Sequence, residues 1–215
     1  KDDEGNLDGK MIRDCICAPE GRTLVEGDFS QLEIRKAAYL SGDQVMIDLL
    51  KTGEDFHQQA ANLMGIGRAE AKTTVFATLY ELPEMLGFLV AKRLKVSSKR
   101  GNEIADAMFG KFKRLKAWMM ERLAAAQERG GSITIWNGQE GRYRPLWHLA
   151  SYQEFLKGQR DNAVRSTWNG ECQGSAADLG TSSLWPLVLA LRAEVPTAQL
   201  ILTVHDSIMV ECDEA

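Results

Sequence analysis

The sequence predicts an α+β protein in which a small antiparallel sheet is combined with many helices. Two observations lead to this fold class. Strand-like segments occur near both ends of the 215-residue chain, at 22–28 and 200–211. Between them, most segments carry apolar residues at helical spacing. Hydrophobic residues make up 44% of the chain, enough for a substantial core in one large domain or two small ones.

The first predicted element is a strand. The segment RTLVEGD, residues 22–28, is typical of a buried strand that ends at Asp28. A helix is then expected from Gln31 to about Leu50, and Gly53 suits a helix end.

Three more helices are expected before the middle of the chain. A short one covers 55–64, and the next runs from about Arg68 to Tyr80 and stops before Pro83. Residues 97–131 open with serines that can cap a helix and end in two glycines, with apolar residues at helical spacing between them. This pattern predicts a single long helix.

The remaining elements return the chain to strands. The segment SITIW, residues 132–136, is a predicted strand, and Asn137–Gly138 a turn. Residues 152–180 have a helical pattern, and Pro186 should break or kink a helix nearby. The apolar flanks of 200–211 predict two short strands joined as a hairpin.

Composition limits the class of protein. No apolar run reaches the length of a membrane span, and the first ten residues do not resemble a signal peptide. The four cysteines, at 15, 17, 172 and 212, fit no zinc pattern, so free thiols in a reducing compartment are expected. The net charge of −4 argues mildly against a nucleic-acid binder, and the basic runs 91–100 and 111–116 are more simply explained as solvated helix faces.

Two aspartates suggest a metal site. Asp28 closes the first strand, and Asp206 lies at the tip of the hairpin, where a tight turn alone would favour Asn-Gly or Asp-Gly. If the first strand pairs with the hairpin, the two carboxylates converge, and a cation such as Mg²⁺ would relieve their repulsion. The alternative is that each aspartate only caps a turn.

Two polar stripes point to a ligand. Arg68, Lys72, Phe76 and Tyr80 recur every four residues on one predicted helix. Two cations followed by two aromatics suit a ligand with a polyphosphate at one end and a flat ring at the other. The second stripe has the same spacing and comprises Arg165, Asn169 and Gln173. The alternative is that both stripes face water.

Taken together, these segments resemble a known enzyme family. GDFSQLEIR (27–35) resembles the first catalytic motif of family A DNA polymerases, RAEAKTTVFATLY (68–80) the second, on the fingers helix, and VHDS (204–207) the third, usually Val-His-Asp-Glu. The segments GEDFHQQAANLMGI and NGECQGSAAD also match the family, in the same order along essentially the whole chain.

The resemblance implies a palm sheet with mostly helical fingers inserted. Residues 1–30 would be the first part of the palm, 31–130 the fingers with the nucleotide-binding helix 67–80, and 131–215 the second part of the palm with the catalytic hairpin 200–212. The thumb and exonuclease domains are expected to lie outside this chain. A phage or phage-related origin and a cytoplasmic location are also expected.

The implied reaction is template-directed DNA synthesis on a primer–template from deoxynucleoside triphosphates, by a protein expected to be a monomer. The resemblance implies two Mg²⁺ ions, with Mn²⁺ as an alternative, held by Asp28, Asp206 and the carbonyl of Phe29. Lys72 would protonate the pyrophosphate. The nucleotide-binding residues would be Arg68, Lys72, His57, Phe76, Tyr80, Glu33 and Gln31, and the residues contacting DNA would be Arg165, Asn169, Gln173 and His205.

Some residues depart from the family pattern. Ser207 stands where the third motif commonly has Glu, and Glu81 replaces the usual Gly after the fingers tyrosine. Val75 and Ala77 flank Phe76 where Asn and Gly are usual. Ser207 makes a single-subunit RNA polymerase one rival, although Glu33, which would pack under the sugar and exclude a 2′-hydroxyl, favours DNA synthesis. A non-catalytic nucleic-acid-binding remnant is the other rival.

Overall fold

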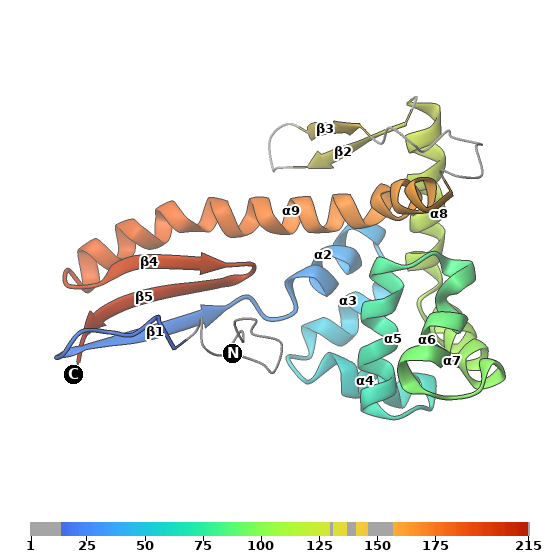
Figure 1. The fold of residues 1–215 in the computed structure, drawn as a ribbon, viewed down its shortest axis with the longest axis horizontal. Coiled ribbons are helices and arrows are strands. Elements are labelled where there is room, and N and C mark those ends of the chain that lie inside the picture. The colour runs from blue at the N-terminus through green and yellow to red at the C-terminus, as the bar shows by residue number, and fades with distance from the viewer. Residues whose placement is uncertain (1–13, 130, 137–140, 146–156, 215) are drawn as a thin grey trace, which may run out of the picture. The chain divides into compact units, whose positions relative to one another are not determined.

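The structure is a computed structural model that describes residues 14–129, 131–136, 141–145 and 157–214 (Figure 1). The chain divides into two compact units. Residues up to Ser30 and from Leu179 onward form what we call the sheet unit, and residues from Gln31 to Asp178 form the helical unit. The predicted α+β class is confirmed. No helix in the described part of the chain is both long and apolar enough to cross a bilayer.

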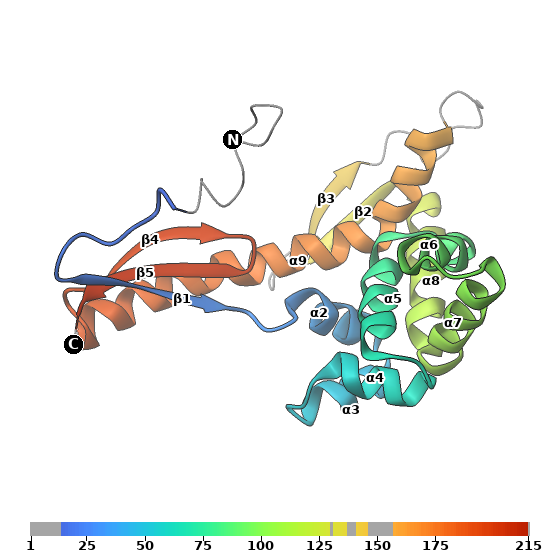
Figure 2. The same ribbon diagram turned by 60° about the horizontal axis from the view of Figure 1, so that its bottom comes forward.

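The sheet unit contains three antiparallel strands. They are β1 (Arg22–Asp28), β4 (Gln199–Val204) and β5 (Ser207–Asp213), and β5 lies between the other two (Figures 1 and 2). The register pairs Arg22 with Asp213 and Asp28 with Ser207. The predicted pairing of the first strand with the hairpin is therefore confirmed.

The two faces of this sheet differ in character. Because side chains alternate along a strand, one face carries Arg22, Glu26, Asp28, Ser207 and Glu211. The opposite face carries Val25, Ile208 and Val210, which together with Leu187 line a cavity of about 320 Å³. The prediction that residues 22–28 are buried is wrong, since Val25 is 52% exposed. In the described part of this unit, the helical segment that carries Leu187 faces this side of the sheet. The face with the charged residues also carries Leu24 and Met209.

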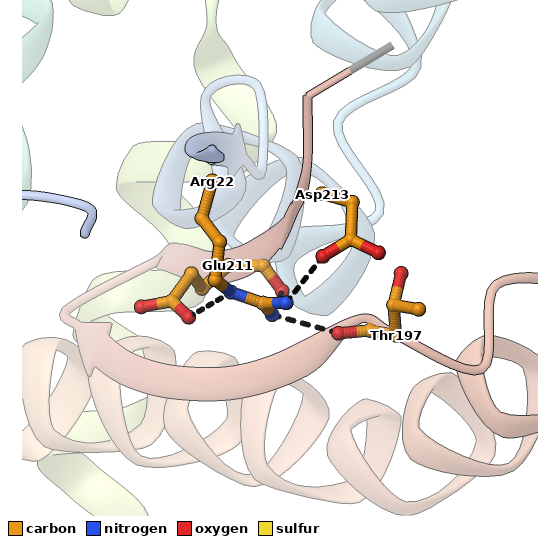
Figure 3. Close-up of polar contacts among 4 residues, drawn as sticks. All are labelled: Arg22, Thr197, Glu211 and Asp213. Carbon is orange, nitrogen blue, oxygen red and sulfur yellow. Dashed lines mark hydrogen bonds and ion pairs between the residues drawn. The ribbon is translucent and has the colours of Figure 1, made fainter. Parts of the chain in front are cut away.

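Arg22 links neighbouring segments at the end of the sheet opposite Asp28. The guanidinium of Arg22 forms ion pairs with Glu211 and, at 2.5 Å, with Asp213, and it donates to the carbonyl of Thr197 at 2.7 Å (Figure 3). The contacts join the start of β1 to the end of β5 and to the turn before β4. They support the register that brings Asp28 opposite Ser207.

The helical unit is built around one large apolar core and a second, smaller cluster formed by Ala126, Ile133 and Ala163. Its largest fully buried side chains include Trp168, Phe56 and Phe112, and the rings of Phe56 and Phe112 stack with centroids 6.3 Å apart. The elements are α2 (Leu32–Ser41), α3 (Gln44–Lys51), α4 (Phe56–Met64), α5 (Arg68–Tyr80), η1 (Pro83–Met85), α6 (Leu86–Leu94), α7 (Ser98–Lys111), α8 (Lys113–Glu128), β2 (Ser132–Trp136) and β3 (Gly141–Pro145). The predicted helices over 55–64 and 68–80 and the strand at 132–136 are confirmed.

The single helix predicted from Gln31 to about Leu50 is in fact two, α2 and α3. Gly42 ends α2 in the left-handed conformation with φ 65°, and Asp43 caps α3 by accepting from the amide of Met46 at 3.2 Å. A glycine C-cap followed at once by an aspartate N-cap stops one helix and starts the next. The apolar spacing continues across the break and conceals it.

The long helix predicted over 97–131 is also two, α7 and α8, which separate at Phe112. Phe112 has φ −102° and ψ 60° and is fully buried in the core. The carboxylate of Asp43 accepts from the amide of Leu115 at 3.0 Å, which satisfies one of the unpaired donors at the start of α8. Core packing of Phe112 and this cap outweigh the helical pattern.

The last helix, α9 (Lys157–Glu194), is longer than predicted and continues from the helical unit into the sheet unit. The helix does not break at Pro186, because this proline lies inside it. Pro186 is exposed, so the carbonyl that loses its backbone partner can be solvated. The predicted turn at Asn137–Gly138 and residues 152–156 lie outside the described residues. Cys17, Cys172 and Cys212 are free thiols.

Candidate functional site

The tip of the β4–β5 hairpin holds the first group of predicted residues. Val204 pairs with Ser207, so His205 and Asp206 form a two-residue turn. His205 has φ 56°, a conformation that costs a non-glycine residue roughly 1 kcal/mol or more. The amide of Phe29 donates to the carbonyl of Asp206 at 3.0 Å. This bond extends the β1–β5 pairing by one step and fixes the turn against the end of β1.

The same pairing brings Asp28 next to Asp206. Asp28 is exposed at the end of β1, and the carboxyl of Asp206 interacts with it closely enough to share a hydrogen bond. Partial removal from water raises the pKa of Asp28, and repulsion from Asp206 and then Glu26 raises it further. Two carboxylates that disfavour each other's ionisation are an arrangement that a cation would relieve.

The donors at this tip fit a divalent cation. They are hard carboxylate oxygens on a rigid turn, and Mg²⁺ is commonly held by one or two carboxylates with substrate phosphates supplying further oxygens. The described residues contain no set of three or more His, Cys, Asp or Glu side chains arranged to bind a metal by themselves.

Sequence reasoning missed Glu26 at this end of the sheet. The hydroxyl of Ser207 donates to the carboxylate of Glu26 at 2.5 Å. Alternation along β1 was the available signal, since it places Glu26 on the same face as Asp28.

The second group of predicted residues lies on α5 and its neighbours in the helical unit. Arg68 and Lys72 are exposed, whereas Phe76 and Tyr80 are half-buried. The guanidinium of Arg68 pairs with Asp55, donating through Nε at 2.9 Å and Nη2 at 2.5 Å. Asp55, which sequence reasoning also missed, caps α4 as well, and its pKa is lowered chiefly by Arg68.

His57 is buried beside this helix. Its ring centroid lies 5.6 Å from that of Phe76, and its Nδ1 atom is buried and has no hydrogen-bond partner among the described residues. Burial lowers the pKa of His57, and the charges of Lys72 and Arg68 lower it further, whereas Asp55 opposes the shift. A buried imidazole nitrogen without a partner, close to two cations, could accept a proton when an anion binds nearby.

The residues expected to shape a sugar pocket meet one another. The hydroxyl of Tyr80 on α5 donates to the carboxylate of Glu33 on α2, and the side-chain amide of Gln173 on α9 donates to the same hydroxyl at 3.4 Å. Burial, followed by the bond to Glu33, raises the pKa of Tyr80 well above its usual value. Gln31 has φ 54° just before α2.

The second polar stripe is not simply a solvated face. Arg165 forms an ion pair with Glu81 at 2.8 Å and also donates to Asn162. Glu81, one of the departures from the family pattern, therefore forms an ion pair with a residue that is predicted to bind DNA. Asn169 is half-buried.

Comparison with known proteins gives a consistent result. A family model described as DNA polymerase family A matches residues 5–215. The chain is 31% identical over 212 residues to the thermostable DNA polymerase I of Thermus aquaticus, covering 94% of this chain and 24% of the relative. It is 31% identical over 210 residues to DNA polymerase I of Mycobacterium tuberculosis, covering 94% of this chain and 22% of the relative. The chain thus spans about a quarter of the length of these curated relatives.

A solved structure is similar over nearly the whole chain. It is the POL domain of Pol1 from M. smegmatis in complex with DNA primer-template and dNTP. The TM-score is 0.82 at 26% identity, and the match covers 96% of this chain and 36% of that one.

Proposed function

Because the chain belongs to DNA polymerase family A, we propose that it is the catalytic core of a template-directed DNA polymerase. It would extend a primer 3′ end with deoxynucleotides in DNA replication or repair. The observation that carries this proposal is the meeting of Asp28 and Asp206 at one end of a sheet. These aspartates come from opposite ends of the sequence, and a turn-capping role for each would not require them to meet.

The sheet unit would serve as the palm and most of the helical unit as the fingers. Asp28, Asp206 and the carbonyl of Phe29 would hold two divalent cations, Mg²⁺ or alternatively Mn²⁺. When bound, these ions would stabilise the negative charge that develops on the attacking and leaving oxygens of the displacement. The hairpin aims Asp206, because its turn is fixed by the bond from Phe29.

The exposed cations of α5 would bind the triphosphate. Arg68 would exchange Asp55 for phosphate oxygens, which accept its planar pair of donors equally well. Lys72 would contact the same phosphates and donate a proton to the departing pyrophosphate. His57 would take up or share a proton as the anion approaches, since its pKa is held low by burial and by these cations.

Tyr80 and Glu33 would bind the sugar side of the nucleotide, beside Phe76. The bond from Tyr80 holds the Glu33 carboxylate in one position, where it would exclude a 2′-hydroxyl. This would favour deoxynucleotides over ribonucleotides. Gln31 would lie near the incoming nucleotide.

The primer–template would be contacted through its backbone and minor groove by Arg165, Asn169, Gln173 and His205. Such contacts position DNA without selecting its sequence, as copying by base pairing requires. A monomeric state, a cytoplasmic location and a phage-related origin remain predictions of the sequence.

Primer extension by the full-length parent protein tests the proposal, with dNTPs and rNTPs supplied in parallel. Extension with dNTPs and little or none with rNTPs is expected. Preferential extension with rNTPs would favour the RNA polymerase rival. Binding to primer–template without extension by either would favour the non-catalytic rival.

A further inference from the structure

We infer that Glu26 is an auxiliary acidic residue of the cation site, a positioning group held at the hairpin tip by Ser207. Glu26 would supply, from β1, a negative charge at the hairpin tip. β5 does not supply this charge, because position 207 is a serine. The inference rests on the proposed function, because it assumes that Asp28 and Asp206 hold the cations.

The strand register places the three residues together. Glu26 and Asp28 are two apart on β1 and share a face of the sheet. Ser207 pairs directly with Asp28, and Met209 pairs with Glu26. Glu26 and Ser207 are therefore diagonal neighbours across β1 and β5, a separation that a glutamate side chain can span.

The side chains make the contact that this register allows. Ser207 Oγ lies 2.5 Å from Glu26 Oε1. A hydroxyl has one proton to donate, and a carboxylate can only accept, so Ser207 is the donor. The bond holds the Glu26 carboxylate toward the hairpin tip rather than leaving it to move freely in solvent.

The two ends of this face differ in whether a protein cation contacts their carboxylates. Away from the tip, Arg22 forms ion pairs with Glu211 and Asp213 and offsets part of their charge (Figure 3). Among the described residues, no lysine or arginine forms an ion pair with Glu26 or Asp28. The tip therefore accumulates carboxylates without a protein cation to balance them, which is unfavourable until a cation binds.

The simpler alternative is that the Ser207–Glu26 contact is an ordinary surface hydrogen bond. Such a bond would stabilise the strand pair slightly and leave cation affinity unchanged. The two alternatives predict different cation affinities when the charge of Glu26 is removed, and again when a carboxylate is restored on the other strand.

The test is a Mn²⁺ titration of the full-length parent bound to primer–template, with free Mn²⁺ followed by electron paramagnetic resonance. Glu26→Gln should raise the Kd for Mn²⁺ by about three- to tenfold, the size expected for losing one nearby charge in a solvated site. Ser207→Ala should raise it less. Glu214→Gln is the matched control, because Glu214 is exposed beyond the opposite end of the strand pair, and it should leave the Kd unchanged.

The decisive variant combines Glu26→Gln with Ser207→Glu. Moving the carboxylate from β1 to β5 should return the Kd to within about twofold of the wild type. A merely structural role for the hydrogen bond would not predict this rescue. Equal thermal midpoints for the variants would confirm that they fold.

Two failures of this experiment are distinguishable. If Asp28→Asn weakens Mn²⁺ binding and Glu26→Gln does not, the inference about Glu26 is wrong and the proposed function stands. If Asp28→Asn also binds Mn²⁺ as the wild type does, the proposed cation site itself is wrong.

Discussion

Tyr80→Phe tests whether the contact between α5 and α2 positions the sugar gate. The change removes one hydroxyl, which donates to Glu33 and accepts from Gln173. A hydrogen bond to a charged group contributes about 1.5–3 kcal/mol, and both side chains are only half-buried, so a loss of about 1–2 kcal/mol is reasonable. If the whole of this energy positions Glu33, discrimination against ribonucleotides should fall by about 5- to 30-fold.

The assay is the ratio of kcat/KM for a dNTP to that for the matching rNTP, in single-nucleotide extension by the full-length parent. Glu33→Ala should lower the ratio at least as far, and the double variant no further, because the two residues act as one unit. Tyr39→Phe is the control, since Tyr39 is 67% exposed. If Glu33→Ala lowers the ratio and Tyr80→Phe leaves it unchanged, the Tyr80 bond does not position the gate. If neither changes it, the gate lies elsewhere.

Three further predictions concern the helical unit. Glu81→Gln should release the Arg165 side chain to contact DNA. The affinity for primer–template should rise roughly three- to tenfold at fixed salt, and the salt dependence of that affinity should steepen by up to about one phosphate contact. Identical salt slopes for the variant and the wild type would contradict this. For His57, the lowered pKa means that the unfolded chain binds more protons just below pH 6.5, so stability should rise with pH up to about that value and then level off. In His57→Gln, the thermal midpoint should vary less between pH 5 and 8 than it does in the wild type. An equal variation in the two proteins would argue against the lowered pKa of His57. Phe76→Tyr should improve the use of dideoxynucleotide terminators, because a tyrosine hydroxyl can replace the lost 3′-OH bond; an unchanged terminator ladder would count against placing Phe76 in the pocket.

Local signals predicted β1, β2, β4, β5 and several helices, but not β3. The segment 22–28 has its predicted bounds, with Asp28 as the last residue of the strand. The helix breaks at Gly42 and Phe112 were missed for a different reason. Apolar spacing continues across both. The caps at Gly42 and Asp43 are local signals that this spacing conceals, whereas the break at Phe112 depends on tertiary contacts such as the bond from the Leu115 amide to Asp43.

The candidate site was predictable to the extent that a resemblance could supply residue types. The resemblance named Arg68, Arg165 and Ser207 but not the acids that partner them. Those partners, Asp55, Glu81 and Glu26, are fixed by contacts between elements, and sequence periodicity alone does not determine such contacts. For Glu81 and Ser207, the sequence showed a departure from the family pattern without showing what the new residue touches.

The measurement closest to the central claim is single-turnover primer extension by Asp28→Asn and Asp206→Asn in the full-length parent, alongside primer–template binding by the same variants. Asparagine keeps the size of the side chain and removes its charge. If the two aspartates hold cations that act mainly in the transition state, both variants should bind primer–template nearly as the wild type does, and extension should slow by at least about a thousandfold. Substantial extension by either variant would contradict the account.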